Sequence, residues 1–91
     1  MKYTLEDLRF YEELTSIDSD VEHKERKEQL AERFGTDDIH MEDLLEGLDI
    51  DKYTYIHGGS FDSPGYDMNS YVVAWLEDGK IKLECFVEES Y

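Results

Sequence analysis

The stretch SYVVAWLEDGKIKLECFVE, residues 70–88, decides the fold. Its first part is rich in β-branched and aromatic residues, which favour strands. Asp78-Gly79 follows, and this dipeptide between two apolar runs is a strong signal for a two-residue hairpin turn. We therefore expect antiparallel strands over residues 70–77 and 80–88. The second of these has apolar residues at every second position, which predicts one apolar face: Ile81, Leu83, Cys85 and Val87.

A third strand is expected upstream, over residues 52–57, where the sequence KYTYIH has a similar composition. Gly58-Gly59 is predicted to end it. The segment that follows, as far as Asn69, is then a long connection, and its Ser63-Pro64-Gly65 has Pro and Gly where a type II turn needs them. Aromatic residues stand among acids in this segment. It either inserts into a partner or packs upon itself as an Ω-loop.

The first half of the chain has apolar residues at helical spacing, which predicts helices over roughly residues 4–15, 20–34 and 38–48. The third helix is expected to bury one stripe of side chains: Met41, Leu44, Leu45 and Leu48. Helices and strands in separate runs are typical of α+β proteins. The sequence therefore predicts one α+β domain over residues 1–91, with two to three helices followed by a three-stranded antiparallel meander.

Three local signals mark the helix ends. Thr4 with Asp7, and Ser19 with Glu22, have the spacing of capping boxes at the starts of the first two helices. Gly35 suits the position after the second helix, where a left-handed residue is common.

The charge of the chain is its unusual property. Nine Lys and Arg against 24 Asp and Glu give a net charge of −15. The net charge of a small domain usually has a magnitude of only about 2 to 8. The longest apolar run, residues 71–76, is far shorter than the roughly 20 residues of a membrane span. The N-terminus resembles no secretory signal, and Cys85 has no second cysteine to pair with. We expect a cytoplasmic protein, in the host cytoplasm if it is phage-encoded, with no membrane partner.

The acids are concentrated in one block. From Phe34 to Asp51 the chain has seven carboxylates and no Lys or Arg. On a helix, four of them would form a stripe spaced on the scale of phosphates along a nucleic-acid strand: Asp38, Glu42, Glu46 and Asp49. The alternatives are a charge that serves solubility or reflects a halophilic source, and an ordinary solvated helix face. The latter explains acids near the helix start but not Glu46 and Asp49 near its end.

No catalytic motif, metal-ligand spacing or phosphate-binding loop stands out. We therefore expect no enzyme activity and no cofactor. Cys85, on the predicted apolar face, is expected to be a buried and inert thiol. One alternative remains: hydrolytic or metal-dependent chemistry that uses His57 with Asp62 or Asp67.

The middle strand is apolar at both alternating sets of positions. If helices cover only one face of the sheet, the other would expose aromatic residues and serve a partner or a second copy. The residues of this predicted face are Tyr71, Val73, Trp75 and Phe86, with Tyr53 and Tyr55 beside them. The alternative is that a helix covers each face.

Small size, strong acidity, tyrosines among carboxylates and the block from Asp37 to Asp51 resemble phage-encoded inhibitors of bacterial defence, namely anti-CRISPR, antirestriction and uracil-glycosylase inhibitor proteins. The resemblance is one of class and rests on no shared motif. It implies that the chain occupies the nucleic-acid groove of a basic host protein or effector complex. Direct nucleic-acid binding is disfavoured because like charges repel.

We predict ten partner-binding residues on this basis: Asp37, Asp38, Glu42, Asp43, Glu46, Asp49, Asp62, Asp67, Phe61 and Tyr66. The alternative function is a structural or regulatory homodimer that uses the aromatic sheet face.

Overall fold

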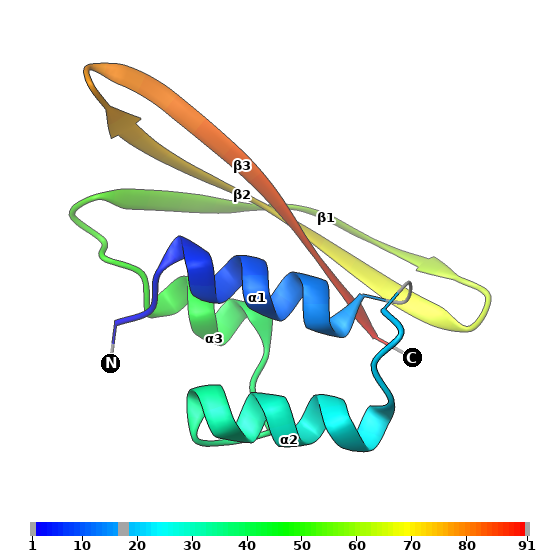
Figure 1. Ribbon diagram of the computed structural model, residues 1–91. Helices are drawn as coiled ribbons and strands as arrows, with labels where there is room; N and C mark the ends of the chain where they lie inside the picture. Colours follow the sequence, from blue (N-terminus) through cyan, green and yellow to red (C-terminus); the bar gives the residue numbers. More distant parts are fainter. Residues whose placement is uncertain (1, 17–18, 91) are drawn as a thin grey trace.

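The computed structural model describes residues 2–16 and 19–90, apart from the side chains of Phe61, Ser63, Tyr66 and Ser90 (Figure 1). Its elements follow in the order α1 (Leu5–Thr15), α2 (His23–Phe34), α3 (Met41–Glu46), β1 (Tyr53–Ser63), β2 (Tyr66–Glu77) and β3 (Lys80–Ser90). The strands form one antiparallel sheet in the order β1-β2-β3. The helices lie on one side of this sheet, and no helix covers its other side in Figure 1. The predicted α+β fold, helices before an antiparallel meander, is confirmed.

The predicted helix ends are partly right. At the start of α1, the Asp7 carboxylate accepts a hydrogen bond from the Thr4 backbone N–H at 2.9 Å, and the Thr4 hydroxyl accepts one from the Asp7 N–H at 3.3 Å. The second predicted capping box is wrong, because α2 begins only at His23 and the Ser19 hydroxyl accepts from the Val21 N–H at 3.2 Å instead. Gly35 ends α2 in the left-handed conformation, with a φ of 78°.

Helix α3 is shorter than predicted. It begins at Met41, where the Asp43 carboxylate accepts a hydrogen bond from the backbone N–H of His40 at 2.9 Å. It ends at Glu46, and the N–H of Gly47 bonds the carbonyls of Asp43 and Leu44 at 3.2 and 3.1 Å. The predicted buried stripe is confirmed, although its last member, Leu48, follows the helix. The predicted stripe of four acids on one helix is wrong, because its first and last members lie outside α3.

The connection predicted between the first two strands is itself a hairpin. β1 continues to Ser63 and β2 begins at Tyr66, so only Pro64-Gly65 forms the turn. Gly58-Gly59 marks a bulge, where the register shifts between His57 and Gly59, rather than the end of the strand. A two-glycine signal is compatible with either outcome, because glycine both ends strands and relieves crowding at bulges. The predicted Asp78-Gly79 hairpin is confirmed, since both residues have positive φ (53° and 76°) as a type I′ turn requires.

The prediction for the sheet faces is wrong. Tyr71, Val73 and Phe86 are only 7, 0 and 0% exposed, because they point toward the helices and fill the core with Leu8 and Leu44. The homodimer predicted through these residues therefore has no surface to use. The outward positions are aliphatic instead, and Cys85 is exposed among them rather than buried. Large aromatic side chains fill the space under the helices, which leaves the smaller aliphatic set outside.

Candidate functional site

The predicted acidic residues of α3 lie on its solvent side. Met41, Leu44 and Leu45 are buried against the sheet and hold the helix in place. The opposite side of the helix exposes three carboxylates: Glu42, Asp43 and Glu46. None of the ion pairs found among the described residues involves these three side chains. The helix therefore presents its negative charge without a neighbouring cation.

The flanking acids are almost as free. Asp38 has a His40 Nε2 atom 3.9 Å away, and Asp49 has the Lys2 Nζ atom at the same distance. Exposed pairs at this range contribute little and are screened by salt. Asp37 is exposed as well. We call the six residues of this region the α3 acidic set: Asp37, Asp38, Glu42, Asp43, Glu46 and Asp49.

Acids outside the α3 acidic set, on α1 and β3, are paired with arginines. Arg9 bonds Glu84 through Nε and Nη2 at 2.9 and 2.7 Å and also bonds Glu6. These bonds, first the one to Glu84, raise the pKa of Arg9 above its usual range. Arg33 bonds Asp7 at 2.9 Å and stacks over the Phe10 ring.

An open polar groove of about 390 Å³ lies between the start of α3 and the inner face of the sheet. Side chains from α3 and all three strands line it: His40, Glu42, Asp43, Tyr55, His57, Asn69, Tyr71 and Glu88. Most of these residues were not predicted from the sequence to belong to a binding site. One signal was present: Glu88 has the same strand parity as buried Phe86, so it is a carboxylate at an inward position.

Glu88 ties the groove to the core. Its side chain is only 13% exposed. Its Oε2 atom accepts hydrogen bonds from the Tyr11 hydroxyl at 2.8 Å and the Met41 backbone N–H at 2.9 Å, with His40 Nδ1 at 3.5 Å. Buried carboxylates require such partners. Burial, followed by the charge of Glu88, raises the pKa of Tyr11 above its usual range, so this phenol stays protonated as a donor.

Two tyrosines present their hydroxyls to the groove. Tyr71 is 7% exposed, and its hydroxyl has no hydrogen-bond partner among the described residues. Burial, and then the charges of Glu88 and Glu42, raises its pKa. Burial and the charges of Glu46 and Glu42 raise the pKa of Tyr55. The groove thus combines two tyrosines with nearby carboxylates, an environment that favours a cation.

The alternative chemistry that uses His57 with Asp62 or Asp67 gains no support, because no hydrogen bond or ion pair among the described residues joins His57 to either acid. The His57 Nε2 atom lies 3.0 Å from the Ser60 hydroxyl, which donates to Asn69 Oδ1 at 2.6 Å. Its ring lies 5.1 Å from that of Tyr71. Within the described part of the chain, no three His, Cys, Asp or Glu side chains are placed to hold a metal ion.

The predicted acids of the β1–β2 hairpin stand apart from α3. Asp62 and Asp67 are cross-strand neighbours beside the turn, at the end of the hairpin that projects past α3 in Figure 1. A hydrogen bond and repulsion from Asp62 raise the pKa of Asp67. The side chains of Phe61 and Tyr66 lie outside the described part of the structure, so their predicted anchoring role stays a prediction.

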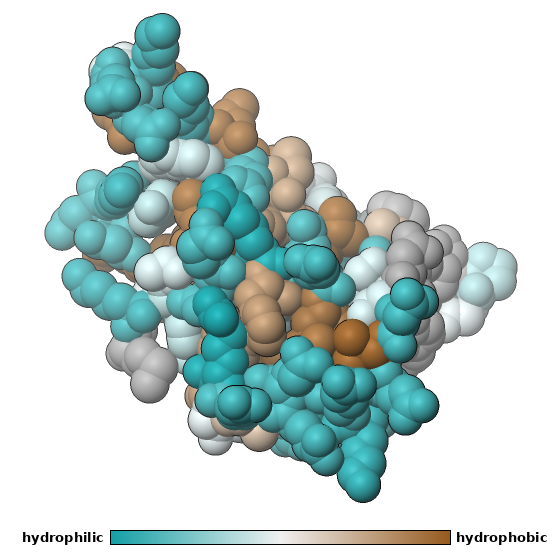
Figure 2. Space-filling model, viewed as in Figure 1, coloured by the Kyte–Doolittle hydropathy of each residue, from teal (hydrophilic) through white to brown (hydrophobic). Residues whose placement is uncertain are grey.

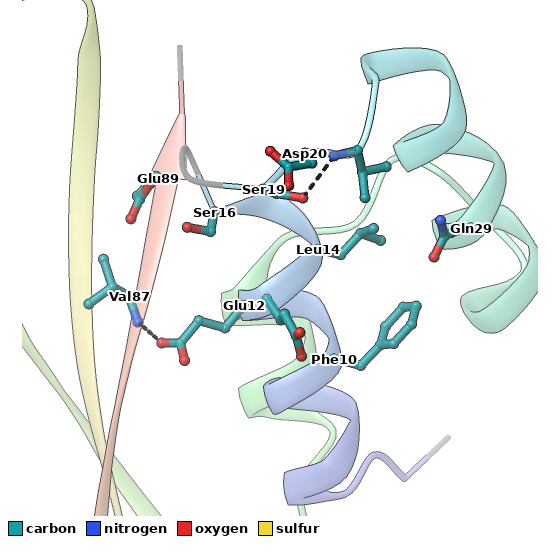
Figure 3. A pocket seen from close by; sticks show the side chains of 11 residues that line it. Phe10, Glu12, Leu14, Ser16, Ser19, Asp20, Gln29, Val87 and Glu89 are labelled. Atoms are coloured by element: carbon teal, nitrogen blue, oxygen red, sulfur yellow. Dashed lines mark hydrogen bonds between the residues drawn. The ribbon is translucent and has the colours of Figure 1, made fainter.

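A larger hollow of about 920 Å³ lies between α1, the start of α2 and β3 (Figure 3). The sequence analysis did not anticipate it. Its most buried acid, Glu12, accepts a hydrogen bond from the Val87 backbone N–H at 2.7 Å, and burial raises the pKa of Glu12. Glu12 therefore supplies a hydrogen-bond acceptor to the edge strand β3.

Comparison with known proteins identifies no relative of this chain. No protein-family model, curated protein or solved structure matches this chain. None of the helices in the described residues has the length and apolar character needed to cross a membrane.

Proposed function

We propose that the chain binds a basic, nucleic-acid-binding protein or complex through the α3 acidic set and the adjoining groove, and inhibits it by taking the place of nucleic-acid phosphates. The observation that carries the proposal is the exposure of Glu42, Asp43 and Glu46 without a cation beside them. The acids around Arg9 and Arg33, by contrast, are neutralised.

The spacing of the acids supports this proposal. Glu42 and Glu46 are four residues apart, so they are separated by about 6 Å along the helix axis. Phosphates along one strand recur at about 3.4 Å of axial rise, which is within a factor of two. A cleft lined with Lys and Arg would release bound counterions on meeting either array, and that release favours binding.

The groove supplies a place for one cationic side chain of the partner. A guanidinium group has several donors and no acceptor, and the groove offers the unpartnered Tyr71 hydroxyl together with Glu42 and Glu88. Aromatic faces also attract such cations. We expect an arginine of the partner to enter here, while its neighbours contact the α3 acidic set.

The resemblance to phage-encoded inhibitors supports inhibition as the consequence of binding. A partner whose nucleic-acid groove is occupied by this chain cannot hold its substrate. Such a partner would place the chain in the cytoplasm. The acids Asp62 and Asp67 would extend the contact only if the partner also reaches the end of the β1–β2 hairpin.

A pair of matched variants tests the proposal. Glu42→Lys with Glu46→Lys reverses two exposed acids of α3, and Glu28→Lys with Glu32→Lys makes the same change, at the same spacing, on exposed positions of α2. Asp43 is left intact because it caps α3. Each protein is used to capture nucleic-acid-binding proteins from a bacterial lysate.

We expect the wild type and the α2 variant to capture the same partner, and the α3 variant to lose it. Raising the salt from about 50 mM to about 200 mM should weaken the wild-type complex by orders of magnitude if several phosphate sites are engaged. Equal capture by all three proteins, or a complex indifferent to salt, would contradict the proposal.

A further inference from the structure

The central part of the sheet's outer face is uncharged. Strand register groups Ile56 with Val72, and Leu76 with Ile81, at positions of opposite parity to the buried residues Tyr71 and Phe86. We define the outer patch by six aliphatic residues of this face: Ile56, Val72, Ala74, Leu76, Ile81 and Leu83. The larger members, Ile56, Leu76, Ile81 and Leu83, are 66, 66, 73 and 66% exposed.

The lack of charge is informative in this particular chain. Charged residues make up 36% of the sequence, and hydrophilic residues cover much of the face shown in Figure 2. Yet the strand positions that point outward between Thr54 and Gly58, between Ser70 and Leu76, and between Ile81 and Cys85 include no charged residue. Monomers rarely leave a contiguous apolar patch of more than a few hundred Å² in water. A surface that avoids carboxylates where the rest of the chain is full of them is suited to being covered by another uncharged surface.

We propose that two copies of this chain pack their outer patches against each other, face to face, around a two-fold axis. An isologous contact needs one self-complementary surface, and an uncharged aliphatic sheet face can pack against the same face of a second copy. A basic partner of the kind proposed above would find no acid here to bind. The dimer does not depend on that proposed function.

The net charge of −15 does not forbid this dimer. Packed sheets lie about 10 Å apart, and a helix adds about 10 Å on the far side of each sheet. The helix layers of the two copies would then be separated by roughly 30 Å, several times the Debye length of about 8 Å at physiological ionic strength. Both α3 acidic sets would remain on the outside, free to bind.

The size of the patch sets the strength of the contact. Three strands at about 4.8 Å spacing and six residue steps of about 3.4 Å give a footprint of about 15 by 20 Å. Counting the protruding side chains, two copies would bury on the order of 1,000 Å², near the lower limit for specific interfaces. We therefore expect a dimer that dissociates in the micromolar range.

Cys85 provides a built-in probe of this face. It is exposed in the single chain and is the cross-strand neighbour of Val72. In the dimer its thiol would be covered. Sedimentation velocity from low micromolar to near-millimolar concentration should show a monomer converting to a dimer, and alkylation of Cys85 by iodoacetamide should slow several-fold over the same range. Added salt should preserve or strengthen this dimer, because it screens repulsion.

Leu83→Lys is the decisive variant, and Ala31→Lys, at an exposed position of α2, is its matched control. Both lower the net negative charge equally, so repulsion alone predicts equal or stronger association. We expect the control to dimerise like the wild type, and Leu83→Lys to stay monomeric with rapidly alkylated Cys85. If Leu83→Lys does not fold, Leu83→Thr, which places a strand-favouring β-branched residue there, should weaken the dimer in the same direction.

Three results would overturn the inference: a wild type that is monomeric throughout, a Leu83→Lys protein that dimerises normally, or a dimer in which Cys85 reacts at the monomer rate. Loss of the dimer leaves the salt-sensitive capture by α3 untouched. The two proposals can therefore fail separately.

Discussion

The α2 and α3 regions of this molecule handle acidic residues in opposite ways. From Glu22 to Phe34, four acids alternate with four bases, and Arg33 of this segment binds Asp7 across the fold. From Phe34 to Asp51, seven acids have no Lys or Arg among them, and among the described residues Lys2 is the one Lys or Arg that forms an ion pair with them, 3.9 Å from Asp49. A charge that served solubility alone would not need this division. This difference is the observation on which the proposed binding to a basic partner rests.

The comparison has a structural counterpart. The exposed acids of α3 stand on a helix of only six residues, which is too short to be stable alone. It is held by Met41, Leu44 and Leu45 in the core and by the bond from the Met41 N–H to Glu88. These contacts hold α3, and with it the exposed acids, in place.

Removing Glu88 should have the largest effect on stability. Glu88→Ala leaves the Met41 N–H without its carboxylate acceptor, whereas the Tyr11 hydroxyl keeps the Ile39 carbonyl at 3.1 Å. An unsatisfied buried donor costs about 1–3 kcal/mol, and we expect the free energy of unfolding to fall by about that amount in urea denaturation. Glu77→Ala, at an exposed position of the same sheet, is the control and should change it little. Equal effects would show that α3 is not anchored through Glu88.

Titration should produce the next largest effect. Burial raises the pKa of Glu12 in the folded state, so the folded protein binds a proton more tightly than the unfolded chain does. Stability should therefore rise as the pH falls from neutral through the folded pKa, and the gain should be complete below the ordinary carboxyl range. Glu12→Gln keeps an oxygen for the Val87 N–H and removes the buried charge. We expect this variant to be more stable than the wild type at pH 7, with a flatter pH profile between about 7 and 4.

The sequence predicted several features that are encoded locally, although the equally local Ser19–Glu22 capping box was wrong. The Thr4–Asp7 cap, the Gly35 helix end and the Asp78-Gly79 turn each depend on two or three neighbouring residues, and all three are present. The orientation of the sheet is different, because β2 is apolar on both faces and its alternation cannot say which face is covered. Phe86 settles this by filling the core.

The groove could not be predicted from the sequence, for a related reason. His40, Tyr55, Tyr71 and Glu88 come from four different elements and are brought together only by tertiary packing. The acidic block was visible as composition, but its predicted single stripe required a helix over residues 38–48. Gly47 ends that helix after Glu46, so the acids before and after α3 have positions that helical periodicity does not give.

Breaking the ion pairs of Arg9 should have a modest effect on the free energy of unfolding. Arg9→Ala removes the bonds of the exposed Arg9 side chain to half-buried Glu84 and exposed Glu6. Surface pairs contribute about 0.2–1 kcal/mol, and we expect a loss in this range by urea denaturation. The loss should shrink at high salt. A loss as large as that of Glu88→Ala would mean that the pairing around Arg9 supports the fold rather than merely balancing its charge.

The smallest predicted effect has the opposite sign. Glu42 and Glu46 are like charges four residues apart on α3, and Glu46 stands at its C-terminal end, where a negative charge opposes the helix dipole. Glu46→Gln should therefore raise the free energy of unfolding by about 0.2–0.5 kcal/mol, whereas Glu32→Gln on α2, where Lys and Arg alternate with the acids, should not. High salt should remove the gain. If Glu46→Gln stabilises the fold while weakening capture of a basic partner, the acid at this position costs stability and contributes binding, which a purely solubilising charge would not do.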